Sequence, residues 1–406
     1  MTNLSSWFTF FVAVYVIFNR YASPISRITL SEFILLLFWG FFFVFHHKKI
    51  RIEWSLVPFC IYLLGYIIIP FTGITTSVSD MTDLVGTAAR VLFIYISIAV
   101  LGKSLFNLEQ GIKFIRYTAL VLAVYACVQM VAAKAGIYLT TYLPFLPSME
   151  THNIDLVISD RSILYGIVYR ASSLLIEPAH LSTYLIAALG LELFSRPHRY
   201  RYVFAVFFSL VILQTLSSTG FFMTVIAWLM FFFQNNHLST KQFLAGAIIA
   251  IIGTFAIGTF TYHVGIWDFF LNRTFYHTAG GLMASTRFYA LQDMFLSSHS
   301  VIGILFGEGM AQVENYLPGF ARMYLYLGLN GLLLIAFFLF RMYTRQTLLQ
   351  KNILLLFIVL NIGTESILGA FAMLYLCLIV TPYTENTQNI SPLGTHTQPL
   401  PTGKQI

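Results

Sequence analysis

The sequence predicts an all-α, polytopic integral membrane protein: a helix bundle with about 11–12 transmembrane helices and two long periplasmic loops. Hydrophobic residues make up 58% of the 406 positions, against roughly 45–50% in a soluble domain. Charged residues make up only 10%, against roughly 25%, which is too few to cover a soluble protein of this size. Apolar segments of about the length of a membrane span recur along the chain, which is typical of a helical membrane protein.

These segments cover residues 4–19, 29–45, 54–71, 84–102, 114–133, 178–194, 202–216, 219–233, 242–262 and 323–340. A last hydrophobic stretch covers 352–380 and is interrupted by Gly363, Thr364 and Glu365, so we expect two helices that meet at a turn. The first segment lacks the features of a cleaved signal peptide and is expected to remain as a helix. Residues 1–380 therefore form a single transmembrane domain, and the polar tail 381–406 is expected to be disordered.

Basic residues predict the orientation, because cytoplasmic loops collect Lys and Arg. With a cytoplasmic N-terminus, the cytoplasmic side holds 14 of the 23 basic residues. They are Lys48, Lys49, Arg51, Lys103, Lys113, Arg116, Arg196, Arg199, Arg201, Lys241, Arg341, Arg345, Lys351 and Lys404. The loops at about 134–177 and 263–322 then face the opposite, outer side. The net charge of +7 reflects this bias, so we expect membrane lipid and not nucleic acid as a partner.

The segment after the first long loop carries a carboxylate, an imidazole and a phenol. Pro178 suits the first turn of a helix, which makes Glu177 the expected N-cap, where the helix dipole stabilises its ionised form. His180 and Tyr184 follow on the same face. Glu177 and His180 are candidate catalytic residues for acid–base chemistry, and Tyr184 is a candidate substrate ligand. The alternative is that Glu177 only caps its helix and pairs with Arg170.

Arginines on the outer side are candidate ligands for a phosphate, which a planar guanidinium binds in bidentate geometry. Arg287, in STRFYA, and Arg322, at the start of the tenth apolar helix, are the strongest candidates. The alternative is pairing with acidic residues of the same loop, which are Asp268, Asp293, Glu308 and Glu314. The histidines of this loop (His263, His277 and His299) lack metal-ligand spacing, so no metal site is predicted.

Three further ionisable residues lie within or beside apolar segments, where a charge is costly and indicates a function or a partner. Arg90 shares a helical face with Asp83 and Thr87, so it is either a substrate ligand or part of a structural pair. We expect Glu192 to pair with Arg196, and Glu365 to face the same outer vestibule as Glu177. The cysteines (Cys60, Cys127 and Cys377) all lie in apolar stretches and are expected to be core residues.

Four motifs within about residues 160–340 resemble motifs of one protein family and occur in the same order as in that family. The helix start RASSLLIEPAHLSTYL (170–185) resembles the "R-x-[ST]-x-x-[FL]-x-E-P" stretch of Wzy-type polysaccharide polymerases. The hairpin SSTGFFMTVIAWLMFFFQ (217–234) and the outer-loop motif STRFYA (285–290) resemble the segments that follow it. The last motif, GEGMAQVENYLPGFARMYLYLGLNGLLL (307–334), resembles the glycine-rich loop before a late "G-x-x-G" helix. The resemblance is to exopolysaccharide and colanic-acid-like polymerases of the O-antigen polymerase and ligase superfamily.

This resemblance implies a glycosyltransferase of the bacterial inner membrane with its active site facing the periplasm. Such enzymes transfer a growing glycan from undecaprenyl pyrophosphate to a new lipid-linked repeat unit, commonly with a separate membrane protein that sets chain length. A metal-independent reaction without a cofactor is expected, since the sequence has no DxD-type site, Walker loop, GxSxG or HExxH motif. Glu177 is then the base, and Arg170, Arg287, Arg322 and Arg90 bind pyrophosphate or glycan.

The departures from the family pattern leave alternatives open. Ligases of the superfamily usually carry a histidine shortly before the late helix, and here that neighbourhood contains Asn315, Tyr316, Leu317 and Pro318, which favours a polymerase. The "R-x10-G" pattern of some polymerases does not follow Arg170, Arg287 or Arg322. An O-antigen ligase and a flippase for lipid-linked oligosaccharides are the alternatives. The concentration of polar groups in two outer loops favours a one-sided active site over a flippase.

Overall fold

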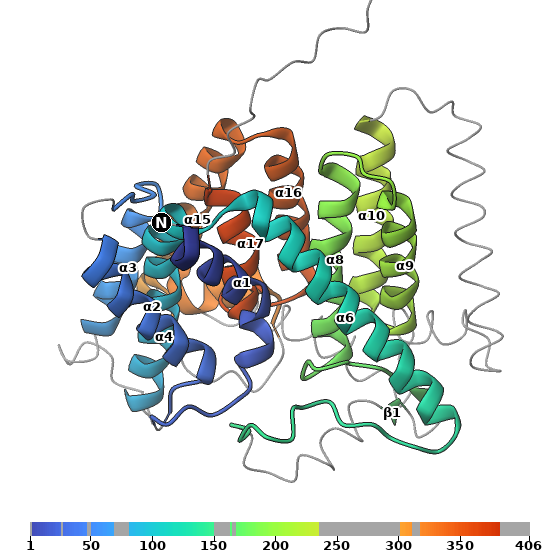
Figure 1. Cartoon of the computed structure of the whole chain (residues 1–406). Helices are drawn as coiled ribbons and strands as arrows, with labels where there is room; N and C mark the ends of the chain where they lie inside the picture. Colours follow the sequence, from blue (N-terminus) through green and yellow to red (C-terminus); the bar gives the residue numbers. More distant parts are fainter. Residues whose placement is uncertain are drawn as a thin grey trace, which may run out of the picture.

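A computed structural model describes residues 2–25, 27–46, 50–68, 81–149, 163–164, 168–234, 301–310 and 317–381 (Figure 1). These residues are almost entirely helical. The exceptions in regular structure are two short antiparallel strands, β1 (Ile163–Leu164) and β2 (Val168–Tyr169), in which Ile163 pairs with Tyr169. The predicted all-helical class therefore holds for the described part of the chain.

The helices follow the predicted apolar segments closely. In the first third of the chain they are α1 (Thr2–Phe18), α2 (Leu30–His46), α3 (Val57–Ile68), α4 (Met81–Ser97) and α6 (Leu108–Lys134). One π-helical turn, η3 (Ile98–Gly102), continues α4 into the short α5 (Lys103–Leu105). The later helices are α8 (Pro178–Phe194), α9 (Arg201–Gln214), α10 (Ser218–Gln234), α14 (Val301–Phe306), α15 (Gly319–Arg345), α16 (Leu348–Gly363) and α17 (Ala370–Val380). The stretch 352–380 thus forms two helices, as predicted, whereas the segment 242–262 lies outside the described residues.

Three helical stretches in the described part are long and apolar enough to cross a membrane, which fits a membrane protein. They are Leu84–Leu105, Leu108–Lys134 and Gly319–Arg345. Several shorter apolar helices accompany them, and their outer faces carry exposed large hydrophobic side chains such as Phe45 and Val131. Exposed apolar faces of this kind suit lipid better than water. The predicted number of crossings and their orientation remain predictions.

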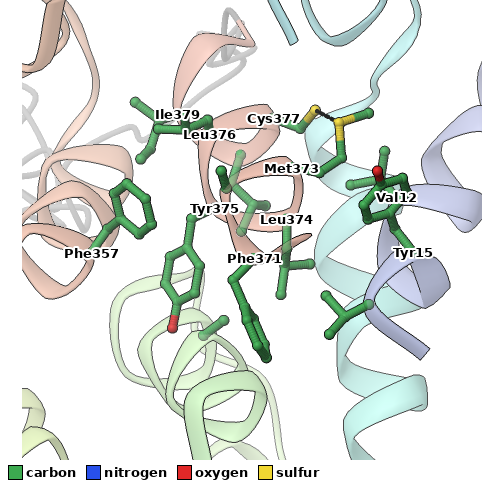
Figure 2. Packing of buried hydrophobic residues seen from close by; sticks show 14 of the residues in the cluster. Val12, Tyr15, Phe357, Phe371, Met373, Leu374, Tyr375, Leu376, Cys377 and Ile379 are labelled. Atoms are coloured by element: carbon green, nitrogen blue, oxygen red, sulfur yellow. Dashed lines mark hydrogen bonds between the residues drawn. The ribbon is translucent and has the colours of Figure 1, made fainter. Parts of the chain in front are cut away.

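Helix α17 forms the centre of the bundle (Figure 1). Every residue from Phe371 to Val380 is buried, because the sequence of this helix has no charged residue and is apolar on all sides. Figure 2 shows its side chains packed against neighbours on both sides, with the Tyr375 ring stacked on Phe357 at 5.0 Å between centroids. Cys377 is a free, buried cysteine, as predicted from its apolar surroundings.

The C-terminal end of α17 needs hydrogen-bond donors, since the last carbonyls of a helix have no partners within it. The side-chain amide of Gln350 donates to the carbonyls of Leu378, Ile379 and Thr381. Lys103 donates to the carbonyl of Val380 at 2.8 Å and pairs with Glu53 at the same distance. Polar side chains from two other elements therefore allow this buried helix to end inside the bundle.

Helix α15 is kinked at Gly328, whose φ of 66° lies in the left-handed region. A Cβ atom at Gly328 would lie 2.5 Å from the backbone of Gly307 and Leu305, so the kink allows α14 to approach closely. Two carbonyls near the kink find donors elsewhere. Leu325 O accepts from Glu308 N at 2.8 Å, and Leu327 O accepts from the Tyr62 hydroxyl at 2.6 Å. The predicted continuous span 323–340 is therefore two helical halves, of which the first carries Arg322.

Candidate functional site

Glu177 immediately precedes α8, at the N-cap position that the sequence predicts, with Pro178 in the first turn. Its side chain makes no capping hydrogen bond, so the carboxylate is directed to other groups. The residue is half-buried. The helix dipole of α8 still stabilises a negative charge at this position. The structure therefore does not support a capping role for the Glu177 side chain, while its pairing with Arg170 remains a prediction.

His180 lies in the first turn of α8 and is also half-buried. Its ring centroid is 5.7 Å from that of Phe371, in the first turn of α17. The two helices are joined one turn further on, where the Tyr375 hydroxyl donates to the carbonyl of Thr183 at 2.9 Å. Figure 2 shows Tyr375 pointing toward the green ribbon of α8. The beginnings of α8 and α17 thus lie together.

Arg322 lies in the first turn of α15 and forms an ion pair with Glu365, in the turn between α16 and α17. The guanidinium also lies over the ring of Tyr326, 5.9 Å from its centroid. The sequence places both residues at the outer side but does not predict that they pair. The structure brings them together because the start of α15 is hydrogen-bonded to this turn, with Gly319 N donating to Thr364 O at 2.7 Å.

The turn that carries Glu365 is held on both sides. Asn361, fully buried at the end of α16, accepts from the backbone N–H of Ile367 at 2.6 Å. The hydroxyl of Tyr95 in α4 donates to the carbonyl of Ile367 at 2.8 Å. Thr364 and Ser366 are buried, and their hydroxyls bond to each other at 2.9 Å. The backbone on either side of Glu365 is therefore fixed, while its own side chain is 41% exposed.

Glu177 and Glu365 interact electrostatically. Burial raises the pKa of the Glu365 carboxyl above its ordinary value, Arg322 opposes that rise, and the negative charge of Glu177 adds to it. Two carboxylates and one guanidinium from α8, α15 and the α16–α17 turn thus share one region. We call Glu177, Arg322 and Glu365 the carboxylate–arginine cluster. Such a set can bind an anion through the guanidinium and accept a proton on a carboxylate.

Arg170 is buried at 7% exposure and holds the backbone beside α8. Its Nε donates to the carbonyl of Thr215, in the turn between α9 and α10, at 2.9 Å. The Thr215 hydroxyl bonds to Ser182 of α8 at 2.6 Å. Gly220 of α10 packs on the same serine, since a Cβ there would lie 2.8 Å from it. The segments 170–185 and 217–234 therefore pack together through Ser182 and Gly220, and the hydrogen bond from Arg170 to Thr215 is a structural contact beside them.

Ser173 adopts a left-handed backbone conformation, with φ of 56°, which is uncommon for a residue with a side chain. Gln129, fully buried in α6, holds this conformation. Its amide oxygen accepts from Ser173 N at 2.8 Å, and its amide nitrogen donates to Ser173 O at 3.2 Å. Gln129 was not predicted as a site residue. The available signal was a lone amide in the apolar stretch 114–133, since polar groups at membrane depth usually have a specific partner.

Tyr184 does not belong to the carboxylate–arginine cluster. It is fully buried, and its hydroxyl donates to the carbonyl of Ala13 in α1 at 2.6 Å. The helical spacing does place Tyr184 on the predicted face, but that face turns into the bundle one turn below His180. We therefore replace the predicted ligand role of Tyr184 with a packing role between α8 and α1.

Arg90 pairs with Glu32 of α2 at 2.6 Å and donates to the carbonyl of Arg27 at 3.0 Å. Glu32 also accepts from the backbone N–H of Thr29 at 2.8 Å, so it is fixed at the start of its helix. This is the structural pair that the sequence left open, although its partner is Glu32 and the side chain of Asp83 lies outside the described residues. The Arg90 side chain is 46% exposed and can still contact a ligand.

Glu192 lies at the other end of α8 and is fully buried. Its carboxylate pairs with Arg116 of α6 and with His198 at 2.6 Å. An ion pair was predicted for Glu192 with Arg196, and the partners that the structure shows for its carboxylate are Arg116 and His198. Arg201 donates to the backbone carbonyl of Glu192 at 2.8 Å. These contacts fix the end of α8 that is remote from Glu177.

The predicted ligand Arg287 lies outside the described residues, as do the histidines of the second long loop. Within the part of the chain that the structure describes, no group of three His, Cys, Asp or Glu side chains is arranged to hold a metal ion. A scan against protein-family models and a search of curated proteins each return no match for this chain.

Proposed function

We propose that the protein is a polysaccharide polymerase, a glycosyltransferase that joins oligosaccharide repeat units carried on undecaprenyl pyrophosphate at the outer face of a bacterial inner membrane. The observation that carries this proposal is the carboxylate–arginine cluster, in which the Arg322–Glu365 ion pair lies within electrostatic range of Glu177 at the start of α8. The family resemblance of the four motifs supports it, because three of them contribute to this end of the bundle.

The reaction needs two kinds of group. The bond from the anomeric carbon of the donor glycan to the pyrophosphate breaks, and its electron pair leaves with the lipid pyrophosphate. A hydroxyl oxygen of the acceptor sugar forms the new glycosidic bond and loses a proton. Arg322 stabilises the charge that develops on the leaving group, and Glu177 accepts the proton. Direct displacement of this kind inverts the configuration at the anomeric carbon.

His180, three residues after Glu177 and in the first turn of α8, is proposed to assist it. Arg170 and Gln129 act as positioning residues, because they fix the backbone of the 170–177 segment that ends at Glu177. Arg287 and Arg90 are proposed as additional ligands for pyrophosphate or glycan. Membrane lipid and a separate protein that regulates chain length are the proposed partners.

The test is gel analysis of surface polysaccharide from cells that lack this gene and are complemented with variants. The deletion strain should carry single repeat units on the normal acceptor, and the wild-type gene should restore long chains. Glu177→Gln should resemble the deletion, while Glu177→Asp should keep partial activity. Glu109→Gln is the matched control, because Glu109 also lies at a helix start but is exposed and remote.

Other outcomes would replace the proposal. Long lipid-linked polymer that fails to reach its acceptor would indicate a ligase. Repeat units retained on the cytoplasmic face would indicate a flippase. Full-length polymer from Glu177→Gln at normal protein level would exclude Glu177 as the base.

A further inference from the structure

Arg322 has one charged partner within the described part of the chain, and that partner is the more accessible of the two. The Glu365 side chain is 41% exposed, whereas that of Arg322 is 19% exposed. Glu365 is therefore the more exposed member of the pair, although its Oε2 atom, which contacts Arg322, is buried.

The guanidinium of Arg322 has a hydrogen-bond donor that remains unpaired among the described residues. Its NH1 group pairs with Glu365, while its Nε is buried and has no hydrogen-bond partner among the residues that the structure describes. The ring of Tyr326 covers the guanidinium at 5.9 Å. A planar guanidinium with a single carboxylate on one nitrogen is a site that a phosphate group can occupy in place of that carboxylate.

Glu365 can leave Arg322 without a change in the fold. Thr364, Ser366 and Ile367 keep their own buried hydrogen bonds, so rotation of the Glu365 side chain alone opens the pair. The attraction between the two opposite charges returns Glu365 to Arg322 when no anion occupies the guanidinium.

We propose that Glu365 is an internal competitor for Arg322: its carboxylate occupies the guanidinium that a lipid diphosphate must take. This inference rests on the proposed function, because it assigns to the same site the diphosphate of a lipid-linked donor. The consequence is weaker binding of the substrate and faster release of the diphosphate product. Glu365 is thus a positioning residue, which regulates the state of Arg322 and does not itself contact the reacting atoms.

The first test measures binding of undecaprenyl pyrophosphate to the purified full-length protein in lipid nanodiscs. Removal of the competing charge in Glu365→Gln should tighten binding by about tenfold, in keeping with the loss of one charge-assisted hydrogen bond. Glu365→Asp, which keeps the charge, should bind like the wild type. Arg322→Ala should bind weakly with or without Glu365→Gln, and Glu109→Gln should leave binding unchanged.

The second test uses the wild-type protein and needs no variant to fold. A water-soluble carbodiimide labels accessible carboxyl groups, and mass spectrometry of the peptide that contains Glu365 measures the extent. Undecaprenyl pyrophosphate should increase labelling of Glu365, because it displaces the carboxylate from Arg322. Unchanged or decreased labelling would overturn the inference.

The two proposals fail in different ways. Wild-type binding that depends on Arg322 but is unchanged or weaker in Glu365→Gln would overturn only the competition by Glu365. Its carboxylate would then simply orient Arg322. Absence of binding to the wild type and to Glu365→Gln alike would overturn both this inference and the proposed use of a lipid diphosphate.

Discussion

Arg322 in the first turn of α15 and Glu365 in the turn between α16 and α17 form an ion pair. A backbone hydrogen bond of 2.7 Å from Gly319 N to Thr364 O joins the same two segments. The position of the guanidinium is therefore set by the fold before any ligand binds. Preorganised charge of this kind is the largest single contribution in many group-transfer enzymes.

The variant Arg322→Lys tests whether the positive charge of Arg322 is sufficient or whether its planar guanidinium is also required. Lysine keeps the positive charge but cannot offer two parallel donors to a phosphate. We expect polymerisation to fall by roughly ten- to a hundredfold, the equivalent of about 1.5–3 kcal/mol for a hydrogen bond to a charged group. Arg345→Lys, in the exposed last turn of the same helix, is the matched control and should keep full activity. Equal activity of both variants would show that Arg322 acts as a simple charge.

Tyr184→Phe should lower stability and leave the product unchanged. The variant loses one buried hydrogen bond to Ala13 O, which contributes about 1 kcal/mol. Tyr375→Phe is a close control, because its hydroxyl also donates to a buried backbone carbonyl, that of Thr183. Both variants should show a similar small fall in melting temperature and normal polymer length. Shorter polymer from Tyr184→Phe alone would return Tyr184 to the substrate site.

Local signals in the sequence predict the helices well. The apolar run that starts at Pro178 gives the bounds of α8, and the polar interruption at Gly363–Glu365 gives the turn between α16 and α17. These features depend on hydropathy and on the backbone preferences of Pro and Gly, which act over a few residues. The position of Glu177 at the start of α8 follows from the same local reasoning.

Partners between helices could not be predicted in this way. Hydropathy identifies a span but says nothing about which helices are neighbours or which face turns inward. The pairs Arg322–Glu365 and Arg90–Glu32 each join two different helical segments, and so does the contact of Gln129 with Ser173. Tyr184 shows the same limit, because helical spacing gives its face correctly while the packing of α8 decides that this face is buried.

Gly328→Ala should disrupt the packing of α14 on α15. The left-handed backbone at Gly328 disfavours a side chain, and the new Cβ would lie 2.5 Å from backbone atoms of Leu305 and Gly307. Backbone atoms cannot rotate away, so we expect a loss of stability of about 2 kcal/mol or more. Gly65→Ala in α3 is the matched control, because no described atom outside the backbone of its own helix lies within 4 Å of the added Cβ. That variant should be neutral or slightly stabilising. Similar melting temperatures for the two variants would contradict the close packing of α14 against Gly328.

Glu53→Gln should change how stability depends on pH. Burial acts to raise the pKa of Glu53, but hydrogen bonds from Lys103 and Ser55 outweigh it and hold the pKa below its ordinary value of 4.5. A carboxyl with a lowered pKa contributes stability above its unfolded pKa and loses that contribution as the pH falls through its folded pKa. At neutral pH we expect Glu53→Gln to cost about 1.5–3 kcal/mol, the range for a hydrogen bond to a charged group.

The measurement is the melting temperature of the purified protein in detergent, from neutral pH down to about pH 3. The gap between wild type and Glu53→Gln should be constant near neutral pH and should close below about pH 4.5, as the wild-type carboxylate takes up its proton. The exposed Glu109→Gln should follow the wild type throughout. A gap that stays the same at every pH would mean that Glu53 stabilises the protein by packing, and that its charge pair with Lys103 contributes little.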